Sequence, residues 1–155
     1  MTPAVLFLDK QKSSFELLEY THDPSNQSFA NEASDKLNLA PEQVFKTLVI
    51  EVDKNHFVVA IIPSNKQLSM KKLAKAASGK KAVMAEAKKV RSMTGYVLGG
   101  VSPFGQKRAL ETFVDDSALN FEQIYVSGGR RGLEIAICPG TFESLLNAKF
   151  DSIAV

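Results

Sequence analysis

Apolar residues recur along this chain at two spacings, one typical of helices and one typical of strands. Thr2 suits a helix N-cap, and Pro3 suits the first helical position. Ala4, Val5 and Leu8 follow at helical spacing, so we predict a helix that ends near residue 12. Comparable patterns predict further helices over residues 30–37, 70–78, 86–92 and 141–148.

Runs of apolar and β-branched residues predict the strands. Residues 45–52 and 56–62 are strand-like, and the short polar turn between them predicts a hairpin. Shorter strands are expected over residues 15–20, 96–98, 110–114, 123–126 and 133–137. The strands arrive in clusters between helices rather than in strict alternation with them. The sequence therefore predicts a single α+β domain over residues 1–155.

Length and composition narrow the protein class. A chain of 155 residues that is 45% hydrophobic and 23% charged can bury a core without cross-links. No apolar run approaches the ~20 residues that span a bilayer, and the N-terminus has no basic segment. We therefore expect a cytoplasmic protein with no membrane partner. With one cysteine and two histidines, the chain is expected to hold no disulfide and no metal.

Charge is strongly segregated along the chain. Residues 1–53 carry a net charge of −5, residues 54–110 carry +11, and residues 111–155 carry −4. A basic central third predicts a positive face that would attract a polyanion in a salt-dependent manner. The alternative is a solvated lysine surface with no partner, and charge alone leaves both interpretations open.

The usual equipment of nucleophilic catalysis is missing. Cys138 follows an apolar run, so we expect it to be buried in the core with a raised pKa rather than catalytic. His22 and His56 are expected to be structural or exposed rather than general bases. There is no Gly-x-Ser-x-Gly, His-Glu-x-x-His, EF-hand or Walker A motif.

Three other features could carry chemistry. Lys46 begins an apolar strand, where it would be dehydrated unless it faced a pocket with an anion or a carbonyl; the alternative is an edge position in water. The glycine-rich segment 99–105 could offer free amides to a carbonyl oxygen or an adenosine, or could be a tight turn. Segment 127–132, with its paired arginines, suits a phosphate or a hairpin loop.

These segments occur together at separated positions that cover essentially the whole chain. In order, they are Tyr20, Phe29, Lys46-Thr47, Thr94-Gly95-Tyr96, Gly99-Gly100-Val101-Ser102-Pro103, Tyr125-Val126-Ser127-Gly128-Gly129 and Arg131-Gly132. The combination resembles the YbaK/EbsC family of small Cys-tRNA(Pro) deacylases, which are similar to the editing domain of bacterial prolyl-tRNA synthetases. The resemblance implies an α+β fold with a mixed, mostly antiparallel, barrel-like sheet and surrounding helices.

The resemblance also implies a reaction. A family member hydrolyses the ester that joins a mischarged cysteine to tRNA(Pro), acting in trans after the synthetase has made the error. The substrate's own thiol is thought to attack the ester carbonyl, so the protein supplies positioning and oxyanion stabilisation and needs no cofactor.

Site roles follow from the same resemblance, position by position. The catalytic residues would be Lys46, Gly99 and Gly100. The substrate pocket would be lined by Tyr20, Phe29, Thr47, Ser102, Pro103, Ser127, Gly128 and Glu134, the last of which is often aspartate in the family. From charge we add that the tRNA phosphates would meet Arg130, Arg131, Lys71, Lys72 and Lys75.

Two alternatives to cysteine editing stay open. A close variant would deacylate Ala-tRNA(Pro), and a different class would be a non-catalytic module that binds tRNA or nucleotides. One small domain at the acceptor end of a tRNA cannot also reach the anticodon. We therefore expect weak selectivity among tRNAs and a complex with prolyl-tRNA synthetase.

Overall fold

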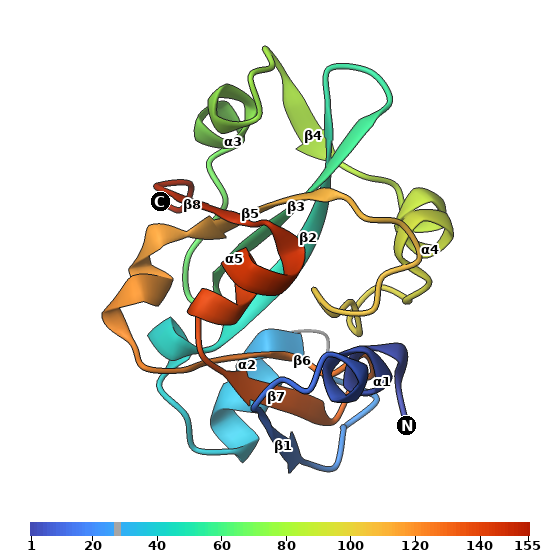
Figure 1. Ribbon diagram of the computed structural model, residues 1–155, viewed down its shortest axis with the longest axis vertical. Helices are drawn as coiled ribbons and strands as arrows, with labels where there is room; N and C mark the ends of the chain where they lie inside the picture. The colour runs from blue at the N-terminus through green and yellow to red at the C-terminus, as the bar shows by residue number, and fades with distance from the viewer. Residues whose placement is uncertain (27–28) are drawn as a thin grey trace.

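The computed structural model describes residues 1–26 and 29–155, without the side chains of residues 29 and 30. Its described strands form two sheets (Figure 1). The antiparallel three-stranded sheet has the order β1 (Glu16–Glu19), β7 (Leu133–Ile137), β6 (Ile124–Ser127). The mixed five-stranded sheet has the order β4 (Ala82–Met84), β2 (Phe45–Val52), β3 (His56–Pro63), β5 (Glu111–Asp115), β8 (Lys149–Asp151).

The α+β class predicted from the sequence is confirmed, with one refinement. The described strands form two sheets rather than a closed barrel, and a single parallel bridge between Val44 and Tyr125 joins the sheets. The β2–β3 hairpin was predicted with the correct β2 bounds. Strands β4 and β8 escaped prediction because each has three residues, too few to show an alternation.

Helices surround the sheets. They are α1 (Pro3–Lys10), α2 (Phe29–Lys36), α3 (Met70–Ala76), α4 (Ala87–Thr94) and α5 (Gly140–Leu146), with 3-10 turns at Pro41–Gln43 and Asp116–Asn120. Thr2 caps α1 as predicted, since its hydroxyl accepts a hydrogen bond from the Val5 N–H at 3.3 Å. Among the described helices, none has the length and apolar character to cross a bilayer.

The strand predicted over residues 96–98 is wrong. Helix α4 ends at Thr94 and is capped by Gly95, whose backbone is in the left-handed region, and the Gly100 N–H then donates to the Val97 carbonyl at 3.0 Å. This turn directs Tyr96 into the core, where its hydroxyl donates to the Phe104 carbonyl at 2.5 Å. The result is a loop anchored in the core at Tyr96 and Phe104, in which Gly99 is partly exposed and Gly100 is buried.

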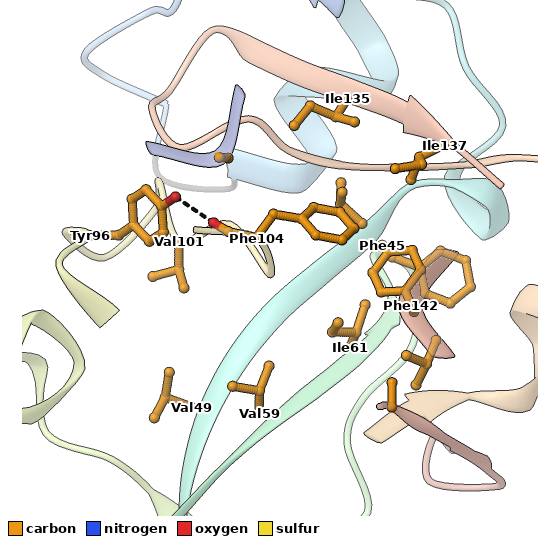
Figure 2. Close-up of a cluster of buried hydrophobic side chains, with 14 of the residues drawn as sticks. Phe45, Val49, Val59, Ile61, Tyr96, Val101, Phe104, Ile135, Ile137 and Phe142 are labelled. Atoms are coloured by element: carbon orange, nitrogen blue, oxygen red, sulfur yellow. Dashed lines mark hydrogen bonds between the residues drawn. The ribbon is translucent and has the colours of Figure 1, made fainter. Parts of the chain in front are cut away.

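The main core lies between the two sheets. Figure 2 shows Phe104 inserted between Ile135 of β7 and Ile61 of β3, and all three side chains are fully buried. Burial of one such side chain stabilises the fold by roughly 2–3 kcal/mol. A second core lies on the other face of the five-stranded sheet, where Leu73 of α3 packs with Ile50. Because Phe104 lies between β7 of one sheet and β3 of the other, loop 96–104 is held against both sheets.

Candidate functional site

A cavity of about 430 Å³ opens where the start of β2, the facing ends of β6 and β7, and loop 98–101 meet. Eight of the residues singled out from the sequence line it: Tyr20, Lys46, Thr47, Gly99, Ser127, Arg130, Arg131 and Glu134. These come from positions 20 to 134 of the chain, and the fold brings them to one place.

Strand β2 supplies two polar neighbours. Lys46 is half-buried against the cavity, and desolvation lowers the pKa of its ammonium. No carboxylate of the described residues lies within ion-pair distance of it. The hydroxyl of Thr47 is buried and has no hydrogen-bond partner in the described part of the chain. Of the two alternatives for Lys46, the structure shows the one that faces a pocket.

Strand β7 supplies a buried carboxyl group. Glu134 is 6% exposed and lies opposite Ser127 of β6 and Leu18 of β1. Desolvation raises its pKa to about 8, and no described residue hydrogen-bonds its carboxyl group. Tyr20 follows β1 and lines the same wall of the cavity. Burial raises the pKa of its phenol, and the negative charge of Glu134 raises it further.

Loop 98–101 contributes backbone. Gly99 has φ +87°, the left-handed region that favours glycine, and its N–H is donated to no described acceptor. Gly100 does not line the cavity, and its N–H already donates to Val97, so this amide is not available to a substrate oxygen. A side chain at Gly100 would approach the Arg130 Cα to 3.2 Å, which explains the need for glycine there.

The two glycine-rich loops touch each other. Arg131 donates from Nη2 to the Leu98 carbonyl at 3.2 Å, which ties loop 127–132 to loop 98–101. Arg130 is exposed, and its Nη2 lies 3.9 Å from the Glu19 carboxylate. Both arginines line the cavity mouth together with Leu98, so the two loops form one wall.

Other residues predicted for the site lie elsewhere. Ser102 and Pro103 are buried, and the Ser102 hydroxyl accepts the Phe104 N–H at 3.3 Å. Gly128 is buried against Leu133. None of the three lines the cavity. The side chain of Phe29 lies outside the described residues, and the predicted lysines of α3 do not line the cavity either: Lys71, Lys72 and Lys75.

The prediction for Cys138 is wrong, whereas the histidines are as expected. Cys138 is exposed, because β7 ends at Ile137 and the chain turns at once into α5. His22 places Nδ1 2.6 Å from Glu32, and His56 is exposed. In residues 1–26 and 29–155, no three His, Cys, Asp or Glu side chains gather to hold a metal ion.

Six further residues line the cavity without having been predicted: Asn31, Phe45, Leu48, Ser64, Leu98 and Val101. Phe45, Leu48 and Leu98 are sequence neighbours of the predicted Lys46-Thr47 pair or of Gly99, and Val101 belongs to the glycine motif but was given no site role. Asn31 on α2 and Ser64 after β3 reach the site through tertiary packing, and no sequence signal marks them.

Sequence comparisons agree on one family. The family model described as the aminoacyl-tRNA editing domain matches residues 25–140. EbsC of Enterococcus faecalis, a proposed Cys-tRNA(Pro)/Cys-tRNA(Cys) deacylase, is 36% identical over 152 residues, which are 98% of this chain and 92% of that protein. A proline–tRNA ligase of Brachyspira hyodysenteriae is 23% identical over 73% of this chain but only 19% of the ligase.

Solved structures show the same fold. A crystal structure of a proposed trans-editing enzyme for prolyl-tRNA synthetase superposes with a TM-score of 0.86 at 21% identity, covering 99% of this chain and 95% of the other. The crystal structure of hypothetical protein APE2540 gives 0.87 at 22% identity, covering 99% of both chains.

Proposed function

This chain belongs to the aminoacyl-tRNA editing domain family, and from that premise we propose that it is a trans-acting deacylase that hydrolyses Cys-tRNA(Pro) in the cytoplasm. The observation that carries the proposal is the content of the cavity. It holds a desolvated lysine, a free glycine amide and a carboxyl group without a partner, but no histidine or cysteine among its lining residues. Such a site is suited to positioning a reactive ester rather than attacking it.

We propose that Glu134 binds the amino acid part of the substrate. An aminoacyl ester carries a free α-ammonium group, and a buried carboxyl group with no hydrogen-bond donor is a suitable partner for it. An adjacent cation stabilises the ionised carboxylate, so the pKa of Glu134 falls when the substrate enters. The unpaired Thr47 hydroxyl provides a second polar contact in the same cavity.

The chemical step then needs only atoms of the substrate. The cysteine thiol attacks its own ester carbonyl, a C–S bond forms, and the bond from that carbon to the ribose oxygen breaks. The thiol proton passes to the departing ribose oxygen, and water later opens the cyclic thioester to free cysteine. Positioning can lower the barrier by ~7–11 kcal/mol.

Lys46 and Gly99 are proposed to stabilise the oxyanion. Both line the cavity, and the Lys46 ammonium and the Gly99 N–H have no competing acceptor in the described structure. A single donor of this kind contributes about 3–4 kcal/mol to the transition state. No cofactor enters the reaction. The partners would be the acceptor end of the aminoacyl-tRNA and prolyl-tRNA synthetase.

Deacylation of tRNA(Pro) charged with cysteine, serine, alanine or proline tests the proposal. We expect wild-type protein to release tRNA fastest from the cysteine ester, and Lys46→Ala to lower that rate about 10²- to 10³-fold. Lys54→Ala, in the exposed β2–β3 turn, is the matched control. Equal rates for cysteine and serine would exclude attack by the substrate thiol. Tight binding without release of tRNA would indicate a binding module instead.

A further inference from the structure

A second hollow lies beside α4 and carries only positive charge. Its volume is about 680 Å³, and it is lined by Ala87, Lys88, Arg91, Ser92, Gly95, Val97, Leu98 and Lys107. Three of these residues are cationic and none is acidic. The hollow is therefore a groove with a local charge of +3, formed by one face of the helix and the chain that follows it.

This groove adjoins the site described above. Leu98 lines both hollows, and its carbonyl accepts the hydrogen bond from Arg131, which lines the site. Val97 and Leu98 are 53% and 48% exposed, so an apolar side chain shared by both hollows, Leu98, is followed on the groove side by a second, Val97. A ligand long enough to leave the site across Leu98 enters the groove directly.

The cations of the groove are not neutralised by the protein. Within the described part of the chain, no carboxylate pairs with Lys88, Arg91 or Lys107. Their backbone is nonetheless fixed, because the Lys107 N–H donates to the Thr94 carbonyl at the end of α4 at 3.0 Å. Unpaired cations on a fixed frame produce a field that attracts a polyanion.

Competing routes are less favourable. A hollow of about 500 Å³ also borders Lys46, but its other charged residues are Lys66 and Asp35, which leaves a net +1. Helix α3 is rich in lysine but packs on the second core, away from α4 (Figure 1). None of its lysines lines any of these three hollows.

We propose that the single-stranded 3′ end of the tRNA runs along the α4 groove. The terminal aminoacyl nucleotide occupies the site, the preceding nucleotides cross Val97 and Leu98, and their phosphates contact Lys88, Arg91 and Lys107. The identity of the RNA rests on the proposed function, whereas the path rests on the groove. This assigns phosphate contacts to α4 rather than to the α3 lysines predicted from the sequence.

Binding of an uncharged tRNA(Pro) acceptor-stem minihelix, measured by fluorescence anisotropy over a salt series, tests the path. We expect a variant with Lys88→Gln, Arg91→Gln and Lys107→Gln to bind about 10- to 100-fold more weakly at 0.1 M salt. The slope of log K against log salt should fall by about 2, because each lost phosphate contact on a single strand removes about 0.7.

Two comparisons locate the effect. The α3 variant with Lys71→Gln, Lys72→Gln and Lys75→Gln loses the same charge, and we expect its affinity to change by less than about threefold. Within α4, Lys88→Gln should weaken binding more than Lys89→Gln, because the Lys89 ammonium lies 6.0 Å from the Phe57 ring centre, and Lys89 does not line the groove. Circular dichroism confirms that each variant is folded.

The possible results separate the path from the reaction. Equal losses in the α3 and α4 variants, or a larger loss in α3, would overturn the α4 path even if wild-type protein deacylates Cys-tRNA(Pro). A selective α4 loss supports the path even if wild-type protein releases no tRNA, and in that case the proposed reaction alone fails. A loss of affinity with an unchanged salt slope would also overturn the path, since phosphate contacts must change it.

Discussion

Two glutamates in this protein have little solvent exposure and opposite surroundings. Glu32 on α2 is 1% exposed, and Glu134 on β7 is 6% exposed. Glu32 accepts hydrogen bonds from the Asp23 N–H at 2.7 Å and from His22 Nδ1 at 2.6 Å, and the Lys36 ammonium lies 2.9 Å away. Glu134 has no such bond to any described residue.

The difference shows that hydrogen-bond partners and depth of burial together decide the charge of each acid, because Glu32 lies near the surface beneath its partners whereas Glu134 lies deep in the fold. Burial alone would raise the pKa of Glu32, but hydrogen bonds from Asp23, His22 and Lys36 lower it to about 2. At Glu134 burial acts unopposed and raises the pKa to about 8. The Glu32 cluster braces α2 against the loop before it, whereas Glu134 is left for a ligand.

Removal of the partnered acid should have the largest effect. Glu32→Ala leaves His22, Lys36 and the Asp23 N–H without their acceptor, and we expect the free energy of unfolding to fall by about 2–3 kcal/mol at pH 7. Urea denaturation measures the loss, with the exposed Glu122→Ala as control. A loss below about 1 kcal/mol would show that the cluster does not brace the fold.

The pH dependence of this loss has a definite sign. The folded pKa of Glu32 lies below its unfolded value of 4.5, so its contribution is present above that value and is lost as the pH falls through about 2. The stabilities of wild type and Glu32→Ala should therefore converge in acid.

Replacement of the unpartnered acid, Glu134, should reveal a pH dependence of stability with the opposite sign. The folded pKa of Glu134 is raised, so its favourable contribution is full below pH 4.5 and is lost as the pH rises through about 8. Relative to Glu134→Gln, wild-type protein should lose about 2 kcal/mol of stability between pH 5 and pH 7. Urea denaturation at each pH measures this, and parallel curves for the two proteins would contradict the raised pKa.

Two threonines with buried hydroxyl groups should give the smallest effect, and they repeat the comparison with neutral groups. The Thr94 hydroxyl donates to the Val90 carbonyl at 2.7 Å, whereas the Thr47 hydroxyl has no partner in the described structure. Thr94→Val should lower stability by about 1–2 kcal/mol, and Thr47→Val should leave it unchanged or raise it by up to about 1 kcal/mol. Thermal denaturation compares them. Equal losses would show that Thr47 is hydrogen-bonded in the folded protein.

The sequence predicted local structure better than it predicted exposure and surfaces. Periodicity located β2, β3 and α1 because their apolar residues face one core or the other. It failed at residues 96–98, where Gly95 and the turn at Gly100 outweigh a short apolar run, and at Cys138, where the strand ends one residue earlier.

Prediction of the site had a similar limit. Lys46 and the glycine-rich segment that holds Gly99 stood out from the residues themselves, whereas Glu134 was assigned only through the family resemblance. Asn31 and Ser64 were not found, since their place in the cavity depends on how α2 and β3 pack. The basic central third was evident from charge, but a net charge does not state which helix faces the site.

The single bridge between the sheets has a consequence for precision at the site. Lys46 belongs to one sheet and Glu134 to the other, and the sheets meet at Val44 and Tyr125. A second bond, from the Gln43 side chain to the Gln123 carbonyl at 2.8 Å, reinforces this junction. Lys46 stands two residues from this junction, so its position relative to the other sheet is set close to the point where the two sheets are hydrogen-bonded.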